Sequence, residues 1–272
     1  VVAILSPNAP ALVEAHFGVP MAGAVLNTLN TRLDAAAIAF ILKHSEAKML
    51  IVDRELGQVA KDALELIDIS IKVIDVIDPA NDGPSIQVSN LDYESFINEV
   101  NPIAPIIWPK DEWDTISINY TSGTTGNPKG VMLTHENILF TIQSLIEQSV
   151  SLGTNPRIVS YLPMAHIAAR LTDHYQSIFR KGQLFPVPVL EDMATALPTI
   201  KPTLFFAVPR VWERFQSGLI NKINESDKKD LALRAIDNGL ERVEYEQRGE
   251  TPPLGIRIKD AIFNKLVFER SF

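Results

Sequence analysis

The sequence contains no cysteine among its 272 residues. A disulfide framework, a thiolate nucleophile and a thiolate metal site are therefore excluded. No apolar run approaches the roughly 20 residues that a membrane-spanning helix needs, so no transmembrane segment is expected. Positive charge is also scarce, because 25 Lys and Arg stand against 33 Asp and Glu, which gives a net charge of −8. A nucleic-acid-binding domain would carry a basic face, so this balance argues against a nucleic-acid partner.

The composition that remains is typical of a globular protein, with 46% apolar and 21% charged residues. Early in the chain, short β-branched runs alternate with amphipathic stretches of helical period. This alternation predicts an α/β fold of layered, largely parallel sheets flanked by helices. We expect Ser6 or Asn8 to cap the first helix, which starts near Pro10. The predicted strands are 1–5, 23–28, 48–52 and 71–77, and the predicted helices are 10–18, 33–44 and 55–66.

The most informative stretch is 120–137, with the sequence YTSGTTGNPKGVMLTHEN. A predicted strand over 114–119 leads into it, so the loop should leave the end of a strand. Gly123 and Gly126 let the backbone approach a polyphosphate closely, and successive N–H groups can form an anion-binding concavity. Pro128 stiffens the turn before Lys129, so the ammonium group is aimed. Further hydroxyl donors come from Ser122, Thr124 and Thr125. This pattern predicts a loop that holds the phosphates of ATP.

Two other interpretations of this stretch are a flexible polar linker and the phosphate loop of P-loop NTPases. A linker has no need of a preceding strand or of a Pro-Lys-Gly sequence after it. The P-loop motif requires a Gly-Lys-Ser/Thr sequence followed directly by a helix. Here Lys129 follows proline, and an apolar run over 131–133 intervenes before Thr134 can cap a helix over 135–148.

The second half of the chain continues the alternation. Strands are predicted at 157–162, 183–187 and 203–208, the last buried on both faces, and helices at 168–180, 193–197 and from Pro209 onward. From the residues alone, His166 reads as a core histidine, Arg170 as a surface helix residue and Trp212 as a helix-packing aromatic. His16 and His44 have no partner at metal-ligand spacing and are interpreted as ordinary packed or surface histidines.

The loop resembles the phosphate-binding motif of the AMP-forming adenylating enzymes, the superfamily of acyl-CoA synthetases and aryl-CoA ligases. Three further segments resemble members of this family. LPMAH, ending at His166, is similar to the segment beside the acyl carboxylate. VPRVWE, which contains Trp212, is similar to long-chain fatty acyl-CoA synthetases, whereas WPKDEWDTISINY is similar to medium-chain and plant-type members. The loop residues that match are Tyr120, Thr121, Ser122, Gly123, Thr124, Thr125, Gly126, Pro128, Lys129 and Gly130.

The resemblance implies ATP-dependent activation of a fatty acid through an acyl-adenylate to acyl-CoA. It also implies that 1–272 is a partial N-terminal adenylating domain with the phosphate loop at 120–130. The motifs for adenine and ribose and a C-terminal domain with a catalytic lysine would follow residue 272. The isolated chain is therefore expected to be inactive. The alternative is a non-catalytic nucleotide-binding module that retains the phosphate loop.

The resemblance also implies the site residues. His166 is the expected catalytic residue beside the carboxylate, Arg170 and Trp212 are further acyl-site candidates, and Thr121 is the candidate ligand for Mg²⁺. The expected small molecules are a fatty acid, ATP, Mg²⁺ and coenzyme A. The expected location is the cytoplasm, with peripheral membrane contact left open. The residues expected to bind ATP are Thr121, Ser122, Gly123, Thr124, Thr125, Gly126 and Lys129.

Overall fold

The computed structural model describes residues 1–79, 81–99, 105–121, 127–148, 155–187 and 190–268. The chain divides into two compact units, Val1–Phe205 and Phe206–Phe272. In the described part of the chain, no helix is both long enough and apolar enough to span a membrane.

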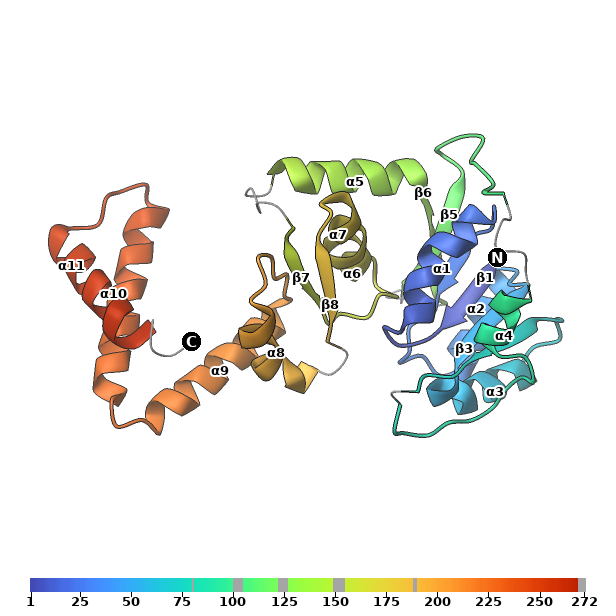
Figure 1. Ribbon diagram of the computed structural model, residues 1–272, viewed down its shortest axis with the longest axis horizontal. Helices are drawn as coiled ribbons and strands as arrows, with labels where there is room; N and C mark the ends of the chain where they lie inside the picture. The colour runs from blue at the N-terminus through green and yellow to red at the C-terminus, as the bar shows by residue number, and fades with distance from the viewer. Residues whose placement is uncertain (80, 100–104, 122–126, 149–154, 188–189, 269–272) are drawn as a thin grey trace. The chain divides into compact units, whose positions relative to one another are not determined.

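The first unit is built on a six-stranded sheet with the order β4-β3-β1-β2-β5-β6 (Figure 1). The first five strands in sequence pair in parallel, and β6 runs antiparallel to β5 at the edge. The prediction of a largely parallel sheet is therefore confirmed, and the antiparallel edge strand was not foreseen. The strands are β1 (Val2–Leu5), β2 (Leu26–Thr28), β3 (Met49–Asp53), β4 (Lys72–Val76), β5 (Thr115–Thr121) and β6 (Lys129–Thr134).

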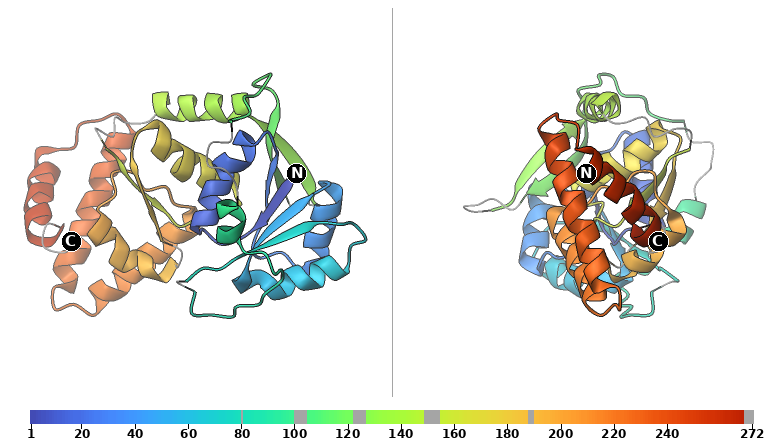
Figure 2. Two further views of the ribbon diagram at one scale, coloured as in Figure 1. Left: turned by 45° about the vertical axis from the view of Figure 1, so that its right-hand side comes forward. Right: turned by 90° about the vertical axis from the view of Figure 1, so that its left-hand side faces the viewer.

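Helices cover both faces of this sheet (Figure 2). Side chains alternate between the faces, so Leu5 and Val52 pack under α2 and α3 while Ile4 and Ile51 pack under α1. Burial on both faces explains the nearly continuous apolar character of β1 and β3. The helices that follow these strands are α1 (Pro10–Met21), α2 (Ala35–His44), α3 (Gly57–Glu65, after a 3-10 turn at Arg54–Leu56) and α4 (Tyr93–Asn98).

The capping prediction for α1 was wrong. Ala9 occupies the N-cap position and supplies no side-chain hydrogen bond. Asn8 instead turns its amide to a distant loop, donating from Nδ2 to the Leu162 carbonyl at 2.9 Å and accepting at Oδ1 from the Met164 N–H at 2.8 Å. We call this pair of bonds the Asn8 clamp. Sequence rules predict that Asn8 caps the helix that follows it. Both polar atoms of its amide instead bind the backbone of Leu162 and Met164, so the amide does not serve as a cap.

The helix after β6 begins where the sequence predicts. This helix is α5 (His135–Gln148), and Thr134 Oγ1 accepts a hydrogen bond from the Asn137 N–H at 3.1 Å. The Asn137 side chain returns the bond, because its Oδ1 accepts from the Thr134 N–H at 3.2 Å. Two N–H groups at the start of the helix are thereby satisfied reciprocally.

A second, two-stranded parallel sheet of the first unit joins β7 (Arg157–Ser160) to β8 (Gln183–Pro186). Between them runs a helical stretch made of α6 (Ile167–Ala169), a π-helical segment (Arg170–Tyr175) and α7 (Gln176–Phe179). After a 3-10 turn (Leu190–Asp192) and α8 (Met193–Ile200), the strand predicted at 203–208 does not form. Only Leu204 makes an isolated bridge, to Ile158, and Phe206 and Val208 are exposed. A single bridge provides no ladder to bury both faces of that run.

The second unit is helical. It contains α9 (Pro209–Asn224), which begins with proline as predicted, α10 (Lys229–Gln247) and α11 (Leu254–Phe263), followed by a π-helical turn at Asn264–Phe268. Helices α10 and α11 are joined by the Asn238 side chain, which donates to the Ile256 carbonyl at 3.3 Å. Arg242 of α10 also reaches Asp260 of α11 at 3.4 Å.

Candidate nucleotide and acyl site

The predicted phosphate loop connects the two strands of an antiparallel hairpin, β5 and β6. Thr121, the last residue of β5, stands opposite Lys129, the first residue of β6. Both residues are exposed, so their hydroxyl and ammonium groups are available to a ligand at the mouth of the hairpin. The loop residues predicted to bind phosphate, Ser122, Gly123, Thr124, Thr125 and Gly126, lie outside the described residues.

Polar side chains are buried beside the hairpin on β5. Ser117 and Asn119 point to one face of the sheet, while Ile118 and Tyr120 point to the other. Both polar residues are at least nine-tenths buried, so each needs a hydrogen-bond partner. Arg170 supplies it: the guanidinium donates to Ser117 Oγ at 2.9 Å and to Asn119 Oδ1.

Asn119 connects the hairpin to the segment that contains His166. Its amide nitrogen donates to the Ala165 carbonyl at 2.9 Å, while its oxygen faces Arg170. Arginine can only donate, so this contact fixes the orientation of the amide. Two sequence motifs far apart in the chain, the phosphate loop and LPMAH, are therefore tied together through one asparagine.

His166 is exposed and lies at the N-cap of α6, where its Nδ1 accepts from the Ala168 N–H at 3.2 Å. No partner for the other ring nitrogen, Nε2, is found within the described ranges of the chain. The segment before it is held on one side by the Asn8 clamp and on the other by Asn119. The interpretation of His166 as a core histidine does not fit this exposure.

Arg170 is fully buried rather than a surface residue, and its partners here are the neutral groups of Ser117, Asn119 and Tyr175. Burial, followed by the nearby Arg170 charge, lowers the pKa of His16 well below its usual value and that of His174 to about 4. Both imidazoles are therefore neutral at physiological pH. Their ring centroids are 5.0 Å apart.

A buried carboxyl lies on the same π-helical segment as Arg170 and His174. Burial raises the pKa of Asp173 to about 6, while the Thr172 hydroxyl bond at 2.8 Å opposes the shift. Sequence reasoning missed the cluster, because His16 lies on α1 and the other members lie on the π-helical segment. A helix with polar residues at consecutive positions 172–174 offers no periodic signal that would reveal their burial.

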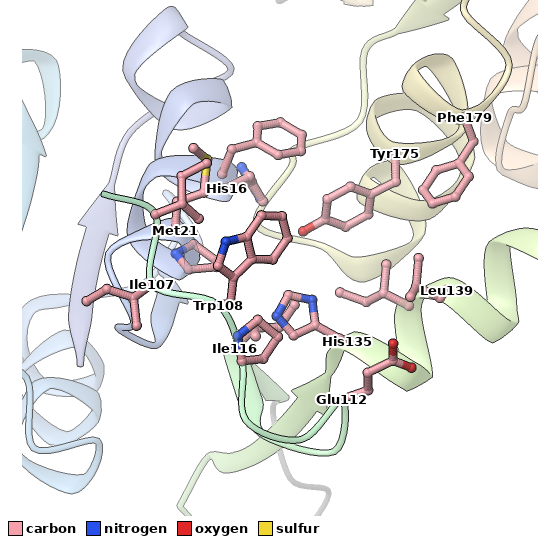
Figure 3. A pocket seen from close by; sticks show the side chains of 15 residues that line it. His16, Met21, Ile107, Trp108, Glu112, Ile116, His135, Leu139, Tyr175 and Phe179 are labelled. Carbon is pink, nitrogen blue, oxygen red and sulfur yellow. The ribbon is translucent and has the colours of Figure 1, made fainter. Parts of the chain in front are cut away.

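An apolar cavity of about 390 Å³ opens beside this cluster (Figure 3). Its walls come from α1, α5, α7 and the segment 106–109, with Trp108 among the side chains labelled in the figure. His166, Arg170, Thr121 and Lys129 do not line it. Of the residues predicted to bind ATP and the carboxylate, these four lie within the described part of the chain, and none of them belongs to the cavity wall.

Trp212 lies in the second unit, on α9. Its indole N–H donates to the Ala207 carbonyl at 3.2 Å, and its ring meets Phe215 edge-on with centroids 6.0 Å apart. Trp212 is exposed, and both contacts lie within α9 and the residues just before it, so they do not decide between the packing interpretation and an acyl-site role. Its role as an acyl-site residue stays a prediction.

The available donors suit ATP better than they define a metal site. Thr121 and Lys129 provide a hydroxyl and a cation at the hairpin mouth, as a polyphosphate requires. Among the described residues, no group of three or more His, Asp or Glu side chains could hold a metal ion. Thr121 as a ligand for Mg²⁺ stays a prediction.

Curated CoA ligases are among the proteins that resemble this chain in sequence. The chain is 46% identical over 181 residues to the peroxisomal trans-cinnamate:CoA ligase of Petunia hybrida, covering 61% of this chain and 32% of that protein. It is 43% identical over 175 residues to the peroxisomal benzoate–CoA ligase of Arabidopsis thaliana, covering 61% and 30%. The chain thus spans about a third of the length of these curated relatives.

Solved structures show the same fold. A long-chain-fatty-acid-CoA ligase (FadD1) from Archaeoglobus fulgidus is 23% identical with a TM-score of 0.65, covering 83% of this chain and 42% of that chain. A benzoate CoA ligase from Burkholderia xenovorans LB400 is 21% identical with a TM-score of 0.64, covering 78% and 40%. Residues 1–244 match the family described as AMP-binding enzyme, so this chain belongs to the AMP-binding enzyme family.

Proposed function

We propose that this chain forms part of an AMP-forming acid–CoA ligase, which activates a carboxylic acid with ATP and transfers the acyl group to coenzyme A. The observation that carries the proposal is the hairpin mouth, where exposed Thr121 and Lys129 face each other and are linked through Asn119 to the His166 segment. This link between the strand that ends at Thr121 and the segment that carries His166 supports a single site for phosphate and carboxylate.

The proposed reaction has two steps. A carboxylate oxygen attacks the α-phosphorus of ATP, and pyrophosphate leaves with the electron pair of the broken P–O bond. The thiolate of coenzyme A then attacks the acyl carbonyl carbon, and AMP leaves. In the first step Lys129 and the loop residues 121–126 hold the β- and γ-phosphates, and His166 helps to define the carboxylate position. Catalysis by such residues is positioning and charge stabilisation.

For the acid, two classes compete. The sequence predicts a medium- or long-chain fatty acid with a tunnel bordered by 203–208. In the structure that run is partly exposed and pairs only at Leu204, which weakens the tunnel argument. The relatives at 41–46% identity carry names for cinnamate, benzoate and acetate. We therefore favour a short or aromatic acid and keep the fatty acid as the second candidate.

Arg170 and Trp212 take different places in this proposal. Arg170 acts on the acyl site indirectly, because its guanidinium orients Asn119 and lies buried. Trp212 remains a candidate for contact with the acid. Mg²⁺ supplies charge neutralisation of the phosphates when bound, with Thr121 as its candidate protein ligand. For the compartment, the cytoplasm and a peripheral membrane contact remain proposals beside the peroxisome named for several relatives.

The deciding experiment is carboxylate-dependent ATP–pyrophosphate exchange by the complete polypeptide encoded by the gene. A panel of cinnamate, benzoate, acetate, butyrate and C6 to C18 fatty acids assigns the acid class, and coenzyme A consumption follows the second step. The 272-residue chain, assayed alongside, is expected to make no acyl-CoA. ATP binding without exchange for any acid would favour the alternative of a non-catalytic nucleotide-binding module.

A further inference from the structure

A hydrogen bond joins the end of α2 to the strand that enters the phosphate loop. The Tyr120 hydroxyl, next to the last residue of β5, lies 2.6 Å from Nδ1 of His44, the last residue of α2. The two rings meet edge-on, with centroids 5.8 Å apart and an interplanar angle of 81°. Phe40, one turn earlier on α2, stacks on His44 at 5.3 Å and 21°. His44 is thus held by its own helix and in turn holds Tyr120.

Tyr120 also lies against the opposite strand of the hairpin. Its partner across β5 and β6 is Gly130, which directly follows Lys129. A Cβ atom at Gly130 would come within 3.1 Å of Cζ and 3.3 Å of the hydroxyl oxygen of Tyr120. Such contacts are tighter than ordinary van der Waals separation, so the absence of a side chain lets the Tyr120 ring lie across the strand. The position of this ring and the position of the Lys129 backbone therefore depend on each other.

The end of β5 is consequently anchored on both faces of the sheet. Asn119 is fixed by Arg170 and Ala165 on the α1 face, and Tyr120 is fixed by His44 on the α2 face. Thr121, the next residue, begins the proposed phosphate loop. A strand end held from both sides presents the following residue and its cross-strand partner Lys129 in one geometry, and such preorganisation favours ligand binding.

We propose that His44 is a positioning residue for ATP, acting through Tyr120 and Gly130 on the β5–β6 hairpin. This inference rests on the proposed function, since it assigns ATP to Thr121 and Lys129. His44 itself does not touch the nucleotide. Its loss displaces the Tyr120 ring and broadens the range of positions that Lys129 adopts.

The test measures the ATP dissociation constant of the complete polypeptide by titration calorimetry. Tyr120→Phe removes only the hydroxyl, His44→Leu removes the ring nitrogen, and His44→Asn keeps a polar atom near the position of Nδ1. Loss of one hydrogen bond predicts an increase of about three- to tenfold in the dissociation constant for the first two variants. We expect His44→Asn to stay within about twofold of the unmodified protein, and the double variant Tyr120→Phe/His44→Leu to be no weaker than the weaker single variant.

A purely structural role predicts a different result. Destabilisation lowers the melting temperature, but it leaves the ATP affinity of the folded protein unchanged. Unaltered affinity in both Tyr120→Phe and His44→Leu, or losses that add in the double variant, would overturn the inference. Gly130→Ala gives a further check, because a methyl group there meets both the Tyr120 ring and Ile118 Cγ2 at 3.1 Å and should weaken ATP binding in the same direction.

Different results would contradict the proposed ligase reaction and the proposed role of His44. If the unmodified protein binds ATP but shows no carboxylate-dependent exchange, the proposed reaction is wrong and the affinity comparison still decides the role of His44. If the unmodified protein does not bind ATP, both proposals are wrong. A rise in the KM of the acid equal to the rise in the KM of ATP would also contradict a role confined to the phosphate hairpin.

Discussion

Arg170 and Asn119 form a buried hydrogen bond that joins the π-helical segment to the strand entering the phosphate loop. The same guanidinium donates to Ser117. Three polar side chains without access to water depend on this arrangement, since Arg170 is fully buried. Removing the guanidinium would leave Ser117 Oγ and Asn119 Oδ1 without these partners.

Arg170→Met should therefore destabilise the protein by about 1–3 kcal/mol, because Ser117 Oγ and Asn119 Oδ1 keep only their mutual 3.5 Å hydrogen bond and a poorly satisfied buried group costs about that much. Arg32→Met provides the matched control, since Arg32 is exposed and its replacement should stay within about 0.5 kcal/mol. Urea denaturation of both variants measures the difference. Equal stability of the two variants would show that the Arg170 contacts are energetically neutral.

Lys129→Ala should weaken ATP binding about tenfold or more without unfolding the protein. Lys129 is exposed at the hairpin mouth, and a charge-assisted hydrogen bond to phosphate contributes about 1.5–3 kcal/mol. Lys61→Ala, on the exposed side of α3, serves as the charge-matched control. An ATP titration that gives the same affinity for Lys129→Ala and the control would remove Lys129 from the nucleotide site.

Thr134→Ala should lower the free energy of unfolding by about 1 kcal/mol, because the Asn137 N–H at the start of α5 loses its acceptor. Thr134→Ser keeps the hydroxyl and should retain most of the stability. The comparison by thermal denaturation isolates the cap from the loss of the methyl group. A Thr134→Ser variant as unstable as Thr134→Ala would assign the effect to packing.

Asp173 and His174 should make the free energy of unfolding of the protein depend on pH in opposite directions. Burial raises the pKa of Asp173 from 3.8 to about 6, so between these values the folded state keeps a proton that the unfolded state has lost. The contribution of Asp173 to stability therefore falls as pH rises. His174 has its pKa lowered from 6.5 to about 4, so over the same range the unfolded state binds the extra proton and stability rises with pH.

Asp173→Asn removes the contribution to stability that falls as pH rises, and it leaves the contribution of His174, which rises with pH. Each slope is at most about 1.4 kcal/mol per pH unit, so the variant should gain about 1–3 kcal/mol relative to the unmodified protein between pH 4 and pH 7. Urea denaturation at pH 4, 5, 6 and 7 gives the two curves. Parallel curves would mean that Asp173 titrates near its ordinary pKa in the folded protein.

The sequence predicts those parts of the fold that depend on local periodicity. The pattern of apolar residues locates β1, α2 and β3 to within a few residues, and Thr134 marks the start of α5. The pairing of the strands is harder to predict from the sequence, because the direction and order of strands in a sheet depend on contacts between distant segments. Val131 to Leu133 reads as an apolar run in either direction, so the antiparallel pairing of β6 could not be predicted.

Some features of the candidate site could likewise be predicted from local sequence, and others could not. The sequence of 120–130 predicts a phosphate loop, and the resemblance of LPMAH predicts a carboxylate-binding segment at His166; both stay predictions. The roles of Asn8, Asn119 and His44 could not be predicted, because each acts through a partner far along the chain. Asn8 even satisfies a local capping rule that the structure does not use.

We expect the Asn8 clamp to form in a definite order relative to the sheet during folding. Its two hydrogen bonds join residues 154 and 156 positions apart in the sequence, whereas β1 to β4 are connected by consecutive strand–helix units. On the ribosome, at about 5–20 residues per second, the residues of β1 and α1 are synthesised several seconds before Met164. Such distant contacts close slowly because chain entropy opposes them. On grounds of chain entropy, we therefore expect the segment that carries His166 to dock after β1 to β4 have paired.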